Sequence, residues 1–163
     1  MTTFVNNVKT AMLLGLLTAL FLVAGHILGG VNGLIFAGIF VAIMNFGAFF
    51  FSDKIAIAAM RGQEVDEQTA PDLVQMIGRL ARNANLPMPR VYICPQDAPN
   101  AFATGRSPKH AAVAVTRGAL RLLDYEELEG VMAHELAHVK NRDTLTSTIA
   151  ATIAGVISYV GWF

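Results

Sequence analysis

The sequence of 163 residues contains one cysteine and two long stretches without any charged residue. A single cysteine, Cys94, cannot form a disulfide within the chain, which argues against a disulfide-stabilised secreted domain and fits a reducing compartment. Asp, Glu, Lys and Arg are absent from residues 10–52 and again from residues 144–163. Helices of soluble proteins nearly always carry a charged face, so these two stretches are not typical of a soluble domain.

The first uncharged stretch divides into two apolar arms, residues 11–28 and 34–51. Each arm has about the length of roughly 20 residues that a helix needs to cross a membrane. Residues 29–33 read Gly-Gly-Val-Asn-Gly, which predicts a tight turn because Gly and Asn tolerate positive φ. We therefore predict a transmembrane hairpin over residues 1–52. The alternatives are a buried helix pair in a soluble protein and a cleaved signal peptide, whose apolar region would be shorter.

The few basic residues around the arms predict how the hairpin is oriented. Lys9 precedes the first arm, Lys54 and Arg61 follow the second, and the turn has neither Lys nor Arg. Because Lys and Arg are enriched on the cytoplasmic side, both ends of the hairpin should face the cytoplasm. Residues 144–163 are long enough for a third membrane helix, which reaches the last residue of the sequence.

The charged segment between these stretches, residues 53–143, reads as a small cytoplasmic α+β domain. Thr69, followed by Pro71 and Asp72, predicts the capped start of a helix that ends near Asn85. Residues 91–93 predict a short strand because they are rich in β-formers, and residues 100–104 and 111–115 predict two strands joined by a polar loop.

Two further helices are predicted after these strands. Thr116 can cap a short helix, and Asp124 with Glu127 three residues later has the pattern of a capping box. In the last helix we expect a buried side made of Leu128, Val131, Met132, Leu136 and Val139.

That last helix carries the sequence His134-Glu135-Leu136-Ala137-His138. Side chains four residues apart project from one face of a helix, so both imidazoles can bind one ion. This is the H-E-x-x-H pattern of zinc peptidases, in which two histidines hold zinc and the glutamate is the general base. We predict one Zn²⁺ per chain, bound by His134 and His138, and a water on that ion activated by Glu135 for peptide hydrolysis. The alternative is a pair of surface histidines beside a surface glutamate.

Catalytic zinc normally has three protein ligands, and the sequence contains no evident third one. No His or Glu follows His138, and we expect Asp143 to lie well round the helix from it. The candidates that folding could recruit have no spacing that favours them: His110, Glu64, Asp66 and Glu67. The simplest interpretation is that the third ligand lies beyond residue 163. Arg142 and Asp143 are either groups that orient the ligands or a solvated helix end.

With the two apolar arms, the metal motif and the segment Asn-Ala-Phe-Ala-Thr-Gly at residues 100–105, the chain resembles the HtpX family. These are multi-pass zinc endopeptidases of the bacterial cytoplasmic membrane, with the catalytic domain facing the cytoplasm. The resemblance implies that His134 and His138 bind zinc, that Glu135 is catalytic, and that a Glu from a later helix is the third ligand. It also implies a stress-response role in quality control, with cleavage of misfolded or damaged membrane proteins.

For the strand at residues 100–104 two interpretations stay open. It is either a cleft strand that binds an extended substrate through main-chain hydrogen bonds or an ordinary strand of the core. The substrate-binding candidates are Asn100, Ala101, Phe102, Ala103 and Thr104. The predicted partners are membrane-protein substrates and the lipid bilayer, with no nucleic acid, and the sequence does not indicate an oligomeric state.

Two rival hypotheses remain beside this protease. In an intramembrane protease the metal helix would lie within the bilayer, but its charges, such as Glu126 and Arg142, would each cost about 2.5–3.5 kcal/mol there. A catalytically incomplete chain or a non-catalytic membrane adaptor would explain why the third ligand is missing.

Overall fold

The computed structural model describes residues 2–144. The described part divides into two compact units, an N-terminal unit that ends at Ser52 and a second unit, Asp53–Thr144. Helix α1 (Thr2–Ala59) forms the first unit, and its last residues belong to the second. The predicted third membrane helix lies outside the described residues.

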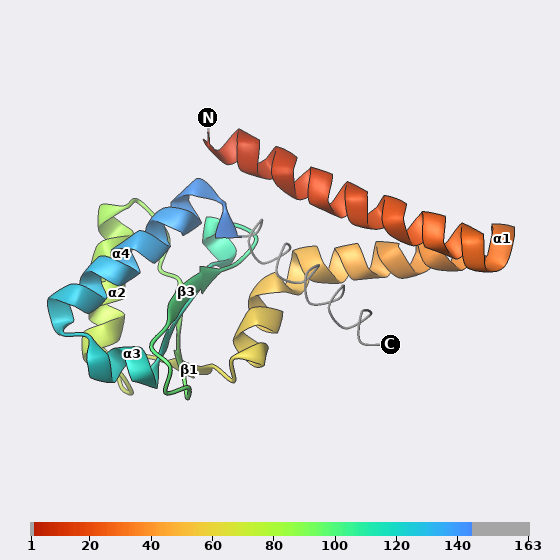
Figure 1. Ribbon diagram of the computed structural model, residues 1–163. Helices are drawn as coiled ribbons and strands as arrows, with labels where there is room; N and C mark the ends of the chain where they lie inside the picture. The colour runs from red at the N-terminus through yellow and green to blue at the C-terminus, as the bar shows by residue number, and fades with distance from the viewer. Residues whose placement is uncertain (1, 145–163) are drawn as a thin grey trace. The chain divides into compact units, whose positions relative to one another are not determined.

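Helix α1 consists of two arms that double back at a break between them (Figure 1). Only Gly29 (φ −141°, ψ 16°) and Gly30 (φ 58°, ψ −138°) leave the helical conformation. The positive φ of Gly30 favours glycine because a Cβ would strain this backbone. The turn was predicted at the right place, but the break is shorter than residues 29–33, and α1 also extends outward beyond residues 11 and 51, to Thr2 and Ala59.

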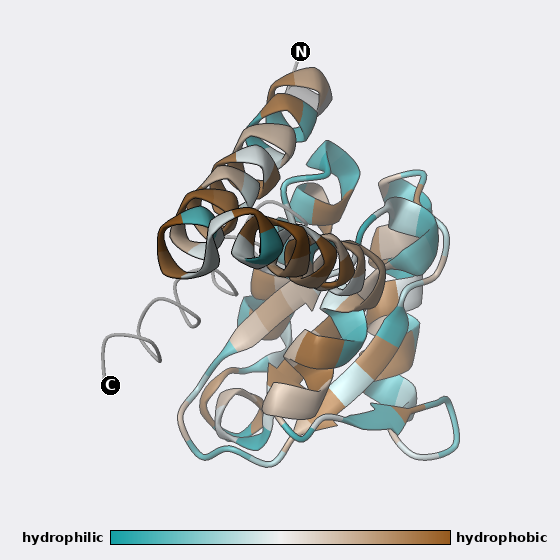
Figure 2. Cartoon of the chain, turned by 90° about the vertical axis from the view of Figure 1, so that its right-hand side faces the viewer, coloured by the Kyte–Doolittle hydropathy of each residue, from teal (hydrophilic) through white to brown (hydrophobic). Residues whose placement is uncertain are grey.

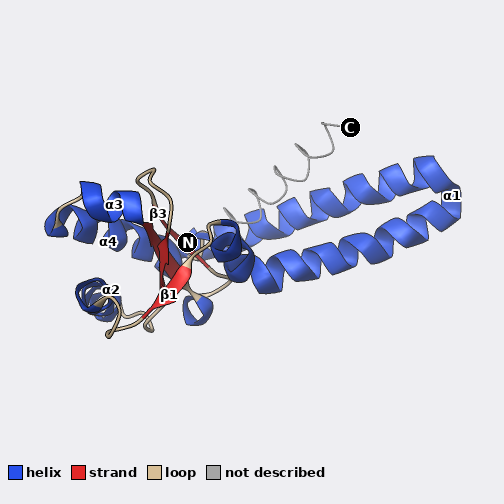
Figure 3. Ribbon diagram, turned by 90° about the horizontal axis from the view of Figure 1, so that it is seen from below, coloured by secondary structure: helices blue, strands red, loops and turns tan. Residues whose placement is uncertain are grey.

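The two arms lie side by side (Figure 3) and approach most closely at small residues. A Cβ on Gly33 would lie 2.0 Å from the carbonyl oxygen of Gly25, so these positions have no room for a side chain. Farther along, Asn45 Nδ2 donates a hydrogen bond to Thr18 Oγ1 over 2.9 Å. Backbone contact at glycines and polar side-chain bonds are the usual means by which membrane helices associate.

The outside of the hairpin is apolar (Figure 2). Within α1, residues 4–59 are long and apolar enough to cross a membrane: an 18-residue stretch in this range has a mean hydropathy of 2.3, and 6% of that stretch is buried. So little burial argues against a buried helix pair in a soluble protein.

The second unit contains a four-stranded sheet in the order β1-β2-β4-β3. Its strands are β1 (Gln63–Val65), β2 (Arg90–Cys94), β3 (Ala101–Thr104) and β4 (Ala112–Thr116). Strands β2 and β4 are parallel, and the other two pairs are antiparallel. The strands expected at residues 91–93, 100–104 and 111–115 are confirmed, whereas β1 was not predicted.

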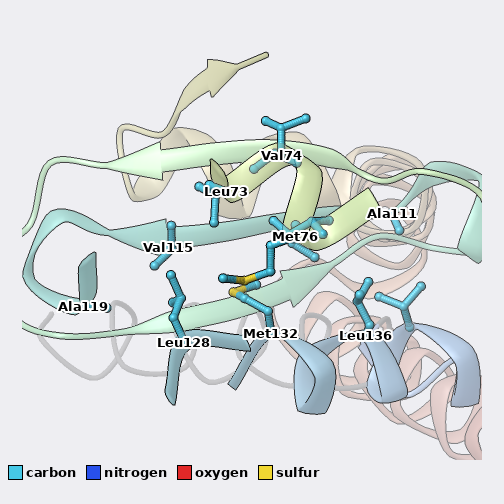
Figure 4. Packing of buried hydrophobic residues seen from close by; sticks show 13 residues of the cluster. Leu73, Val74, Met76, Ala111, Val115, Ala119, Leu128, Met132 and Leu136 are labelled. Atoms are coloured by element: carbon cyan, nitrogen blue, oxygen red, sulfur yellow. The ribbon is translucent and has the colours of Figure 1, made fainter. Parts of the chain in front are cut away.

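The helices of the second unit are α2 (Pro71–Asn83), a 3₁₀ turn η1 (Pro108–His110), α3 (Arg117–Leu122) and α4 (Tyr125–Asn141). Helices α2 and α4 pack on one face of the sheet, and Leu128, Met132 and Leu136 point from α4 into this core (Figure 4). Ile57, near the end of α1, packs on the other face against Tyr92 and Cys94. The mixed α and β domain is therefore confirmed, and Cys94 is fully buried.

Two of the three predicted helix caps are present. The Thr116 hydroxyl accepts a hydrogen bond from the amide of Ala119, and Asp124 and Glu127 form the complete capping box at the start of α4. The predicted cap at Thr69 is wrong. Its amide and hydroxyl both donate to the carboxylate of Asp66, which lowers the pKa of Asp66, and α2 starts after Ala70 without a side-chain cap.

A polar network joins the end of α1 to the sheet. Arg90 pairs with the buried carboxylate of Asp53 and donates to the hydroxyl of Tyr92 over 3.2 Å. This hydroxyl donates to Glu64 over 3.0 Å. The pKa of Tyr92 is raised, mainly because the side chain is buried and secondly because its hydroxyl is hydrogen-bonded to Glu64. The network links α1, β1 and β2 through side chains that are separated in sequence.

Candidate metal and catalytic site

The metal motif lies on the accessible side of α4. Leu128, Met132, Leu136 and Val139 are buried as expected, while Val131 is only half-buried. With this face packed on the sheet, His134 is exposed and Glu135 and His138 are half-buried. The capping box sets the start of α4, and the buried face sets its rotation, so the motif is presented at the surface of the unit.

The two imidazoles face each other across one helical turn. The Nε2 atoms of His134 and His138 are 3.1 Å apart, and the ring planes are nearly perpendicular, at 89°. Two nitrogens at about 2.0–2.1 Å from one tetrahedral zinc ion would be about 3.3 Å apart. The spacing and the chemistry of these two nitrogens therefore fit two ligands of a single zinc ion.

Glu135 connects the metal motif to strand β3 at the edge of the sheet. Its Oε2 accepts a hydrogen bond from the backbone amide of Ala103 in β3 over 3.1 Å. This bond connects the carboxylate to one of the candidate substrate-binding residues. The sequence predicted both segments but had no signal that they touch, because they are 32 residues apart.

Asp143 contacts His138, contrary to the expectation that it lies well round the helix. Helix α4 ends at Asn141, and Arg142 adopts the left-handed conformation (φ 56°, ψ 34°). This turns the chain back, so that Asp143 Oδ2 lies 3.0 Å from His138 Nδ1. The hydrogen bond with Asp143 is the main cause that raises the pKa of His138, against the lowering by burial.

The position of Asp143 matches the orienting role that we left open for it. A ligand histidine usually donates its second ring nitrogen to a carboxylate or carbonyl, which sets the tautomer and the ring direction. With a proton on Nδ1, His138 presents its Nε2 lone pair toward His134. Because Asp143 contacts the opposite nitrogen, it does not supply the third ligand in this arrangement.

Within residues 2–144, no group of three or more His, Cys, Asp or Glu side chains is placed to hold a metal ion. His110 Nδ1 lies 2.9 Å from the Ser107 hydroxyl in the loop after β3. Glu64 accepts from Tyr92, and Asp66 binds Thr69 in a turn. The described structure therefore does not recruit these candidates as a third ligand.

The segment at residues 100–104 forms an edge strand. Among the described strands, β3 pairs only with β4. Phe102 packs with the cluster on the α1 side of the sheet, and Thr104, two residues along the strand, lies on the same face. Asn100 exchanges backbone and hydroxyl hydrogen bonds with Thr116. The group of this strand that donates a hydrogen bond to Glu135 is the main-chain amide of Ala103.

Comparison with known proteins agrees with this arrangement. The profile described as peptidase family M48 matches residues 67–162, which is more than half of the chain. The chain belongs to peptidase family M48. The matched region of this M48 chain contains the sheet from β2 onward and all of α4.

The M48 chain is also similar to proteins named protease HtpX homolog, which confirms the resemblance inferred from the motifs. Those from Burkholderia multivorans, Burkholderia ambifaria and Burkholderia cenocepacia are each 58% identical to it over 158 residues. The alignment covers 97% of this chain and 55% of each relative. The chain thus spans about half the length of the curated relatives it matches. The roles assigned to His134, Glu135 and His138 stay predictions.

Proposed function

We propose that this chain forms part of a membrane-bound, zinc-dependent endopeptidase. The observation that carries the proposal is the pair of Nε2 atoms 3.1 Å apart on one face of α4, with the carboxylate of Glu135 beside them at strand β3. This combination provides two metal ligands, a base and a strand edge in one place. Membership of family M48 supports the same reaction class.

In this proposal His134 and His138 hold the metal, and Asp143 keeps His138 in the tautomer that binds. Zinc supplies a water of lowered pKa and polarises the peptide carbonyl when it is bound. Glu135 removes the proton of the attacking water and passes it to the departing amine. Its contact with Ala103 holds the carboxylate at the strand edge, where the scissile bond would lie.

We propose that the substrate is an extended, loosely folded segment of a misfolded or damaged membrane protein. An edge strand recognises a peptide chiefly through main-chain hydrogen bonds, which give little side-chain selectivity. The small side chains of Ala101 and Ala103 pack against the core, so β3 would offer a paired peptide mainly its main chain. The apolar hairpin supports a place in the bacterial cytoplasmic membrane, with the second unit facing the cytoplasm.

The third zinc ligand is proposed to be a Glu from a helix beyond residue 163. The relatives are nearly twice as long as the aligned region and have room for it. The alternative is a catalytically incomplete chain or a membrane adaptor, which the two-histidine set in the described residues favours.

Metal analysis separates these alternatives. We expect about one zinc per chain in a form extended to the length of the relatives, loss of zinc when His134 is replaced by Ala, and weak retention in the 163-residue form. Tight stoichiometric zinc in the short form would contradict a third ligand beyond residue 163.

Cleavage of a loosely folded substrate tests the role of Glu135 in the extended form. Glu135→Gln keeps the shape of the side chain and removes the base, so zinc should stay bound while cleavage falls at least about 10²-fold. Glu126→Gln, which changes an exposed glutamate in the first turn of the same helix, is the matched control. Unchanged cleavage by Glu135→Gln would remove Glu135 from the mechanism.

A further inference from the structure

Besides the bond of Ala103, a second hydrogen bond joins the end of β3 to the segment that follows α4. After the turn at Arg142, the hydroxyl of Thr144 donates a hydrogen bond to the carbonyl oxygen of Gly105 over 3.0 Å. Gly105 directly follows β3, and Thr144 is only 7% exposed. The bond therefore joins the end of the strand to the segment that follows α4.

The three residues after α4 contact both the metal motif and the end of β3. Arg142 turns the chain, Asp143 contacts the ligand histidine His138, and Thr144 contacts the end of β3. A displacement of this segment would therefore move a ligand and the strand edge together. This arrangement links metal geometry to the position of the strand.

The backbone at the end of β3 is constrained at Gly105. Gly105 has a φ of 129°, which side chains rarely adopt, and a Cβ there would lie 2.3 Å from the carbonyl oxygen of His110. The chain turns away from the sheet edge at this residue, toward η1. The carbonyl of this turn residue is the group that Thr144 binds.

Two polar groups along β3 and its end are thus bound by the metal-helix segment. The amide of Ala103 donates to Glu135, and the carbonyl of Gly105 accepts from Thr144. A substrate could replace Glu135 as the partner of the Ala103 amide without breaking a buried hydrogen bond. It could not replace Thr144 in this way, because Thr144 is buried. The second bond is buried, whereas the first is only partly buried.

We propose that Thr144 is a positioning residue that holds the end of β3 against α4 and closes the strand edge at Gly105. A peptide that pairs with β3 then ends its pairing before Gly105, and the amide of Ala103 stays within reach of Glu135. The proposal rests on the proposed function for its effect on substrate, but the attachment itself does not.

Hydrogen exchange of the β3 amides tests the attachment in the full 163-residue chain, solubilised in detergent. Thr144→Val keeps the shape and removes the donor, so the amides of residues 101–105 should exchange roughly two- to tenfold faster, as expected for one lost hydrogen bond. Thr144→Ser restores the hydroxyl and should restore the slow rate. Thr69→Val, which removes a hydroxyl from the Asp66 turn, is the control and should leave these amides unchanged.

If Thr144→Val does not fold, Thr144→Ala and Thr144→Ser are compared in its place. Equal exchange in the Val, Ala and Ser variants and in the unchanged chain would overturn the proposal, as would fast exchange in Thr144→Ser. These outcomes do not require catalysis.

A form extended to the length of the relatives tests the effect on substrate. Thr144→Val should raise KM for an extended peptide roughly two- to tenfold, as one lost hydrogen bond predicts, with kcat within about twofold. Thr144→Ser should restore KM. A loss confined to kcat would overturn the positioning role. Absence of cleavage in every form would instead reject the proposed function, and the exchange measurement would still decide the role of Thr144.

Discussion

The two units of this chain distribute apolar and polar side chains in opposite ways. In the hairpin, large apolar side chains such as Ile43 face outward, while Thr18 and Asn45 are bonded to each other between the arms. In the second unit, Ile77 and Met132 are completely buried, while charged residues such as Glu126 lie at the surface.

This difference reflects the solvent around each unit. In water, burial of apolar area is the main favourable term, so the sheet and its helices enclose their apolar side chains. In lipid that term is missing between helices, and association depends on close contact and hydrogen bonds. The contact of Gly25 with Gly33 and the bond between Asn45 and Thr18 are of this second kind.

The largest expected effect is the loss of a core side chain in the second unit. Ile77→Ala removes a fully buried side chain and should destabilise the unit by about 2–5 kcal/mol. Ile43→Ala makes the same chemical change on the outside of the hairpin and should cost much less, because lipid replaces the lost contacts. Hydrogen exchange in lipid bicelles measures both. Equal losses would mean that the outside of the hairpin is packed like a core.

A charge on each surface sharpens the comparison. Ile43 and Leu122 are almost equally exposed, at 66% and 67%, but lie in different units. Ile43→Lys should oppose membrane insertion by about 2.5–3.5 kcal/mol, whereas Leu122→Lys should stay within about 0.5 kcal/mol on stability. A translocon insertion assay measures the first and thermal unfolding the second. Normal insertion of Ile43→Lys would contradict a membrane-embedded second arm.

The smallest effect concerns the hydrogen bond between the arms. Thr18→Val and Asn45→Val each remove it, and a double-mutant cycle in bicelles should give a coupling of about 0.6 kcal/mol, with an upper limit near 1.7 kcal/mol. The cycle is needed because Asn45 Oδ1 is buried without a partner among the described residues, so replacing Asn45 also removes that cost. A coupling near zero would leave close packing alone as the basis of the hairpin.

Features with a local cause were predicted well. Asp124 and Glu127 form their capping box because both partners lie in the same turn, and α4 follows with the expected buried face. Gly30 turns the hairpin because its own backbone tolerates positive φ. In each case a few neighbouring residues contain the whole physical reason.

The errors arose where two local interactions competed or where distant segments met. Thr69 has a side chain suited to capping a helix, but its amide and hydroxyl are instead hydrogen-bonded to the carboxylate of Asp66. Asp143 was placed by extending an ideal helix, and the left-handed Arg142 changed its direction. The short β1 has only three residues and was not recognised, since its pairing with β2 gives it its form.

By itself the sequence determined the apolar arms, the helix with two histidines on one face, and the glutamate between them, because helical period and hydropathy are properties of neighbouring residues. Only the tertiary structure decided that Glu135 meets Ala103, that Asp143 meets His138 and that Thr144 meets Gly105. These contacts depend on how α4 packs beside an edge strand and on the one backbone turn that follows it, and no periodicity in the chain encodes either.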